Sequence, residues 1–121
     1  MRPLAFVDLE TTGATATHDR ITEIGIVEVD ADGSVREWQQ LVNPGMRIPP
    51  FIEQLTGISN DMVEDAPPFE AVASETLKHL EGRLFIAHNA RFDYGFLKNE
   101  FKRIGIAFRA SVLCTVKRSG T

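Results

Sequence analysis

The apolar segment at residues 4–7 constrains the fold most, because it lies near the start of the chain and runs directly into two acids. Consecutive apolar residues followed by a Thr-Thr-Gly turn at 11–13 are typical of a buried strand that ends there. Side chains alternate along a strand, so Asp8 and Glu10 face the same side, with Cα atoms roughly 6.5 Å apart. Carboxylates at that spacing suit one hard divalent cation, or two cations about 3.5–4 Å apart. An isolated Asp-x-Glu is more often a solvated strand end, so the rest of the chain must support a metal site.

Composition predicts one small globular domain, residues 1–121, in a reducing compartment. The 121 residues are 43% hydrophobic and 25% charged, which is ordinary for a globular domain. No apolar run reaches the length of a membrane helix, no signal peptide is visible, and the single Cys114 excludes an internal disulfide. We therefore expect a cytoplasmic protein with no membrane partner.

Charge is divided unevenly along the chain. Residues 1–82 hold 5 Lys and Arg against 15 Asp and Glu, a balance of −10, whereas residues 83–121 hold 8 against 2, a balance of +6; together they give the net charge of −4. An acidic part that holds cations and a basic part that holds phosphates would suit a nuclease. Ordinary solvated surface charge explains the same division equally well.

Periodicity predicts an α/β layer fold with the first strand in the centre. Two β-rich runs at 21–29 and 35–42, joined by the turn Asp32-Gly33, follow the first strand and indicate an antiparallel meander. Glu23 lies in the second strand, where it either faces the acidic site or, more often for such a residue, faces solvent. The later elements are expected to be a short helix at 50–56, a turn at 59–63, a helix opened by Pro67 and Pro68 and ended by Gly82, a buried strand at 84–87, a helix at 91–104 and a short strand at 112–113.

Asp93 is the third candidate carboxylate. It lies in the first turn of a predicted helix, directly after a buried strand, where it also faces the positive end of the helix dipole. If the strand at 84–87 pairs beside the first strand, Asp93 arrives close to Asp8 and Glu10. Three converging carboxylates need a cation such as Mg²⁺ or Mn²⁺. The alternative for Asp93 alone is an acid that only stabilises its helix.

Three ordered motifs together resemble the DEDD 3′→5′ exonucleases of the histidine type, the branch that includes the proofreading subunit of bacterial DNA polymerase III. Phe6–Gly13 resembles their first motif, Leu55–Ile58 resembles the loop near the terminal nucleotide, and His88–Asp93 resembles the second motif. The resemblance runs from residue 4 to about residue 116.

This resemblance implies a ribonuclease H-like fold, with a central mixed five-stranded sheet and flanking helices. It implies two Mg²⁺ or Mn²⁺ ions held by Asp8, Glu10 and Asp93, and removal of nucleoside monophosphates from single-stranded or frayed DNA 3′ ends, with a DNA polymerase as a partner. The substrate-binding residues it implies are Thr11, Thr12, Leu55, His88, Asn89 and Phe92.

The third motif of the family has no counterpart in this sequence. After Asp93 there is no histidine to act as general base, and the last acid, Glu100, lies in the helix of the second motif. His18 lies in the loop after the first motif, where a histidine is more often plain surface. We therefore expect the N-terminal two-thirds of a catalytic domain, with a rate reduced by several orders of magnitude and with an apolar sheet surface open to self-association.

Three alternatives stay open. The first is an RNA-trimming relative of the same fold. The second is a non-catalytic nucleic-acid-binding module that keeps the fold. A phosphatase that uses Asp8 as nucleophile is the third alternative, but it explains neither the second motif nor the Thr-Thr-Gly turn.

Overall fold

The computed structural model describes residues 2–115; the segment 117–121, where the final part of the catalytic domain is expected to begin, lies outside these residues. None of the helices in the described part is long and apolar enough to cross a membrane. In chain order the elements are β1 (Leu4–Thr11), β2 (Ile21–Val29), β3 (Val35–Leu41), α1 (Pro50–Thr56), α2 (Asn60–Glu64), α3 (Phe69–Leu80), β4 (Leu84–Ala87), α4 (Ala90–Arg103) and β5 (Val112–Cys114).

The five strands form one mixed sheet with β1 in the centre. The strand order is β3-β2-β1-β4-β5. β1, β2 and β3 form the predicted antiparallel meander, while β4 runs parallel to β1, and β5 runs parallel to β4. The predicted α/β class and the pairing of the fourth strand with the first are therefore confirmed.

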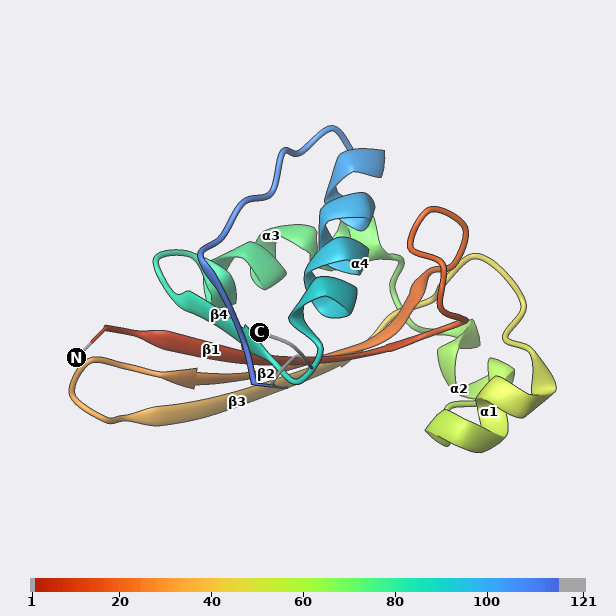
Figure 1. Ribbon diagram of the computed structural model, residues 1–121. Helices are drawn as coiled ribbons and strands as arrows, with labels where there is room; N and C mark the ends of the chain where they lie inside the picture. Colours follow the sequence, from red (N-terminus) through yellow and green to blue (C-terminus); the bar gives the residue numbers. More distant parts are fainter. Residues whose placement is uncertain (1, 116–121) are drawn as a thin grey trace, which may run out of the picture.

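β1 is buried on one face only. Ala5, Val7 and Leu9 are at most 6% exposed and face α3 and α4, which lie on the same side of the sheet (Figure 1). Phe6 points to the other side and is 41% exposed. The expectation of a buried strand thus holds for alternate residues. We call the side that carries Phe6, Asp8 and Glu10 the open face.

The two long helices cover the sheet through aromatic side chains. Phe69 of α3 and Phe101 of α4 meet edge to face, with ring centroids 5.0 Å apart, and both belong to the main core. Helix α3 begins at Phe69 and not at the predicted prolines, because Pro68 stays extended and forms the N-cap. Helix α4 begins one residue earlier than predicted, at Ala90.

A buried carboxylate fixes α4 to the start of β2. Glu100 is 1% exposed and accepts hydrogen bonds from Arg20 Nε at 3.0 Å, Arg20 Nη2 at 2.8 Å and the Ile21 backbone N–H at 3.0 Å. The helix that carries Asp93 is therefore tied to the strand that lies next to Asp8 and Glu10.

Helices α1 and α2 lie beyond one end of the sheet (Figure 1) and have a small core of their own. The turn expected at 59–63 is helix α2, capped by Ser59, whose Oγ accepts a hydrogen bond from the Met62 backbone N–H at 3.2 Å. Gly57 ends α1 with a left-handed φ of 76°, as its position after the helix predicts. This small core consists of Ile48, Ile52, Ile58 and Val63.

Candidate active site

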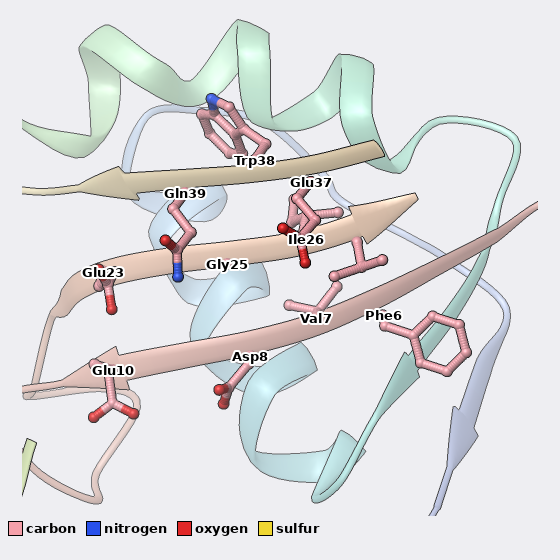
Figure 2. A pocket seen from close by; sticks show the side chains of 11 residues that line it. Phe6, Val7, Asp8, Glu10, Glu23, Gly25, Ile26, Glu37, Trp38 and Gln39 are labelled. Carbon is pink, nitrogen blue, oxygen red and sulfur yellow. The ribbon is translucent and has the colours of Figure 1, made fainter. Parts of the chain in front are cut away.

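The two acids of β1 lie on the open face, as the strand period predicts. Figure 2 shows Asp8 and Glu10 extending from the same side of β1. The residue beside Asp8 on β2 is Gly25, where a Cβ atom would lie 3.3 Å from the Asp8 carbonyl oxygen. The glycine therefore leaves space beside Asp8.

Glu23 also lies on this face, which is the less favoured of the two positions that the sequence left open for it. It lies beside Glu10 in the ladder between β1 and β2. Asp8, Glu10 and Glu23 line one hollow of about 500 Å³, with Gln39 of β3 on its far side (Figure 2). We call it the carboxylate hollow. Only the register between β1 and β2 decides which acid of β2 meets Glu10. The sequence does not fix that register, because residues 12–20 join the two strands as a long loop and the ladder shifts between Glu10 and Thr11.

Asp93 reaches the same strand end from α4. It is 6% exposed in the first turn of α4, directly after β4. Burial is the largest cause that raises its pKa to about 7; a hydrogen bond from the Leu9 backbone opposes the rise, and the charges of Asp8 and Glu10 add to it. Asp93 is therefore within electrostatic reach of both β1 acids, as the sequence predicts.

Glu10 and Glu23 also have raised pKa values. Burial raises the pKa of Glu10, and the charges of Asp8 and Glu23 raise it further. Burial and the charge of Asp8 do the same for the pKa of Glu23. Within residues 2–115, Lys, Arg and His form no ion pair with any of these acids.

This donor set fits a hard divalent cation in its chemistry. Mg²⁺ and Mn²⁺ prefer carboxylate oxygens, and a cation would offset the repulsion that raises these pKa values. As the side chains stand, however, no three His, Cys, Asp or Glu residues of the described chain are gathered closely enough to hold a metal ion. The three predicted acids lie near one another, but their carboxylates do not converge on a single point.

The Thr-Thr-Gly turn is held rigidly beside the acids. Thr11 Oγ1 donates to the Gly13 carbonyl at 2.7 Å, and Thr12 Oγ1 donates to Asp19 Oδ1 at 3.0 Å. Asp19 also accepts from the Thr15 backbone N–H at 3.0 Å. Because both threonine hydroxyls are used internally, the backbone of the turn is the part that can meet a ligand. Sequence reasoning missed Asp19, whose role depends on the closure of this loop.

A second, apolar hollow of about 390 Å³ adjoins the acids, and we call it the apolar hollow. Leu55 and Phe92, both predicted substrate contacts, lie on it together with Glu10 and Thr11. The Phe92 ring packs against Phe96 with centroids 4.7 Å apart. Phe51 of α1 also lines this hollow, although the sequence singled out only Leu55 from that helix.

His88 and Asn89, the remaining predicted substrate contacts, lie at the start of α4. Both are exposed. Asn89 is the N-cap of α4 and lines a third hollow of about 310 Å³ with Arg91 and Phe92. The carbonyl of His88 accepts a hydrogen bond from Cys114 Sγ at 3.4 Å. His88 lines neither the carboxylate hollow nor the apolar hollow.

A family model described as exonuclease (RNase_T) matches residues 5–119. The chain is 44% identical over 115 residues to the 3′-5′ exonuclease DinG of Bacillus subtilis, and 40% identical over 112 residues to the PolC-type DNA polymerase III of Caldanaerobacter subterraneus. Each alignment covers 93% of this chain but only 12% and 8% of those proteins. The chain therefore spans a small part of the length of these relatives.

Solved exonuclease structures share the fold. Exonuclease X in complex with 5′ overhanging duplex DNA has a TM-score of 0.72 at 29% identity, over 93% of this chain and 59% of that one. Escherichia coli exonuclease I in complex with a dT13 oligonucleotide has a TM-score of 0.75 at 21% identity, over 85% of this chain and 24% of that one. With its ribonuclease H-like sheet and a family model that spans almost the whole sequence, this chain belongs to the DEDD exonuclease family.

Proposed function

We propose that this chain is the nuclease part of a 3′→5′ exodeoxyribonuclease that removes nucleoside monophosphates from DNA 3′ ends. The observation that carries this proposal is that Asp8, Glu10 and Asp93 lie within electrostatic reach of one another near the C-terminal end of β1, without a basic ion-pair partner among residues 2–115. Carboxylates that lack a counter-charge are expected where a phosphodiester reaction uses divalent cations.

In this proposal Asp8, Glu10 and Asp93 hold two Mg²⁺ or Mn²⁺ ions, and Glu23 completes the negative lining. The cations, when bound, supply positive charge that lowers the pKa of the attacking water and offsets charge on the leaving 3′ oxygen. The pKa of Asp93, at about 7, makes its proton easy to displace near neutral pH.

Residues around the carboxylates would orient the 3′ end of the DNA strand. The backbone at Thr11 and Thr12 is fixed by the turn and would contact the terminal sugar and phosphate. Leu55 and Phe92 on the apolar hollow would contact the base. Asn89 at the start of α4 would contact the sugar-phosphate backbone of the adjoining nucleotide. We do not assign the role of general base to His79. Its Nδ1 lies 2.7 Å from Glu28 Oε1 in a hydrogen bond, and its ring is stacked on Trp38.

Relatives support DNA as the substrate and a polymerase as a partner. The names of the two sequence relatives are a 3′-5′ exonuclease and a DNA polymerase III, and exonuclease X was solved with duplex DNA. We therefore propose that the chain acts on DNA, in the context of a replicative polymerase or a repair enzyme.

The test is release of mononucleotides from a 3′-labelled single-stranded DNA oligonucleotide in Mn²⁺. We expect Asp8→Asn and Asp93→Asn to abolish the release that the unsubstituted chain gives, because each removes a cation ligand. Asp61→Asn, an exposed acid in the first turn of α2, is the matched control and should leave release unchanged. A 5′-labelled oligonucleotide should shorten stepwise from its 3′ end.

Other outcomes select other functions. Equal or faster release from the RNA oligonucleotide of the same sequence would replace the proposal by an exoribonuclease. Binding of single-stranded DNA without release, in both the unsubstituted chain and Asp8→Asn, would replace it by a nucleic-acid-binding module.

A further inference from the structure

Another large hollow lies at the end of the sheet opposite to the candidate active site. β1, β4 and β5 run parallel and in register, so all three begin at the same edge. Arg2, Arg83 and Ser111, which each come just before one of these strands, line a hollow of about 500 Å³. Asp8 comes six residues after Arg2, which is about 20 Å along an extended chain. Figure 1 shows the start of β1 at the end of the sheet away from α1 and α2. We call this site the arginine hollow.

Aliphatic side chains form much of the lining of the arginine hollow. Leu77 and Leu80 come from the last turn of α3, and Ile106 comes from the irregular segment between α4 and β5. Phe108 of the same segment also lines the hollow, but it is 5% exposed and its ring is stacked on Phe101. The hollow therefore suits aliphatic side chains better than nucleobases, which stack on free aromatic rings.

Two arginines at the hollow carry charge that no acid of the described chain neutralises. Arg2 and Arg109 are exposed and form no ion pair within residues 2–115. Arg83 is instead paired with Asp30 and donates to the Val29 carbonyl at 3.2 Å. Unpaired guanidinium groups favour an anionic ligand, and their planar fork matches a carboxylate.

The segment between α4 and β5 also offers unused backbone donors. The N–H groups of residues 107–110 donate to no acceptor in the described part of the chain. Ala107 and Ala110 line the hollow, and their small side chains cover little of this backbone. Unpaired N–H groups along one segment can bind the carbonyl groups of an extended peptide.

We propose that the arginine hollow binds an extended peptide segment of a partner protein, in which aliphatic side chains alternate with carboxylates. Successive side chains of an extended peptide point to opposite sides, so the aliphatic ones can enter the hollow while the carboxylates reach Arg2 and Arg109 at its edge. A nucleic-acid strand fits less well, because Glu81 also lines the hollow and repels a polyanion. This inference does not depend on the proposed function, since it concerns the other end of the sheet.

The experiment measures peptide binding without DNA or metal. Fluorescein-labelled Gly-Leu-Glu-Leu-Glu-Leu-Gly is titrated with the chain in EDTA and followed by fluorescence anisotropy, beside the glutamine peptide Gly-Leu-Gln-Leu-Gln-Leu-Gly. We expect the glutamate peptide to bind about 5-fold more tightly, because ion pairs with exposed arginines contribute modestly. Arg109→Glu should remove most of that preference.

Two further variants locate the binding site. Ala107→Phe places a large side chain at the hollow and should weaken the binding of both peptides. Arg47→Glu makes the same change of charge at an exposed arginine just before α1, outside the hollow, and should alter neither complex. All three substituted positions are exposed, so we expect each variant to keep the circular dichroism spectrum of the unsubstituted chain.

Three results would overturn this proposal. They are binding of neither peptide, equal binding of both peptides by the unsubstituted chain, and a glutamate preference that Arg109→Glu leaves unchanged. If Arg109→Glu weakens a single-stranded oligonucleotide in the same titration but not the glutamate peptide, the hollow belongs to nucleic acid and the proposal is also wrong.

Failure of the proposed function gives a different pattern. A chain that binds the glutamate peptide through Arg109 but releases no nucleotide from DNA retains the peptide site and loses the exonuclease proposal. A chain that releases nucleotides but binds neither peptide retains the exonuclease and loses the peptide site.

Discussion

Asp93 is buried and lies within electrostatic reach of two other acids. Its ordinary pKa of 3.8 rises to about 7, mainly through burial and then through Asp8 and Glu10. Without a cation, the folded chain therefore keeps a proton on this group that the unfolded chain has lost by about pH 5. Binding of a cation must displace that proton, so metal affinity is coupled to pH.

The raised pKa of Asp93 makes the stability of the metal-free chain fall as pH rises. Between about pH 4 and pH 7 the folded state binds more protons than the unfolded state, so the stabilisation present at low pH is lost as pH rises through the folded pKa. We expect the free energy of unfolding, measured with urea in EDTA, to drop by a few kcal/mol from pH 5 to pH 7.5. Glu10 and Glu23, whose pKa values are also raised, contribute to this drop in the same direction as Asp93.

Asp93→Asn should make this fall distinctly smaller, because the amide does not titrate. Asp61→Asn, on the exposed side of α2, should retain the full slope. Parallel curves for the unsubstituted chain and Asp93→Asn would show that the folded-state pKa of Asp93 is close to its unfolded value.

At the scale of elements, α4 is positioned by the ion pair between Arg20 and Glu100. Glu100 lies seven residues, about two turns, after Asp93 on the same helix. It is buried, and Arg103 approaches it at 3.4 Å in addition to Arg20. The ion pair connects the loop that follows the Thr-Thr-Gly turn to α4, the helix that carries Asp93.

Breaking this ion pair should cost more stability than a surface pair would. Arg20→Ala leaves Glu100 buried with fewer partners, and we expect a loss of about 2–3 kcal/mol, below the value for a fully buried pair because Arg20 is partly exposed. Lys102→Ala, an exposed cation of the same helix, should cost less than about 1 kcal/mol.

The double variant tests whether the two residues act as a unit. If they do, Arg20→Ala combined with Glu100→Gln loses less stability to urea than the sum of the single variants. Strict additivity would mean that the two residues stabilise α4 independently.

At the scale of the whole molecule, the sequence predicts what depends on periodicity and misses what depends on register and docking. The meander and the central strand follow from apolar runs and turns and are confirmed. Asp93 lies within electrostatic reach of Asp8 and Glu10, as the pairing of β4 with β1 implies. Glu23 joins the carboxylate hollow only because β2 pairs with β1 in one register. Phe51 lines the apolar hollow only because α1 docks beyond the end of the sheet, and no periodicity encodes that docking.

The sheet also has two unequal faces. The face under α3 and α4 is packed, whereas the open face carries Phe6, 41% exposed, and Leu113, 51% exposed. Ile86, which is itself buried at 5% exposure, lies beside Phe6 in one ladder and beside Leu113 in the next, so the exposed Phe6 and Leu113 share a face. Exposed apolar side chains on a regular sheet face favour association with a second copy.

We therefore expect this chain to self-associate through the open face. Sedimentation velocity should show a dimer whose proportion increases with salt, because the acids of the carboxylate hollow on two copies repel one another and salt screens that repulsion. The paired variant Phe6→Ser with Leu113→Ser should shift the chain to monomer over the same concentrations. Phe51→Ser removes a more exposed apolar residue away from this face and should leave the dimer unchanged. A dimer that survives the paired variant and dissociates with Phe51→Ser would place the contact on α1, where it would compete with a nucleobase for the apolar hollow.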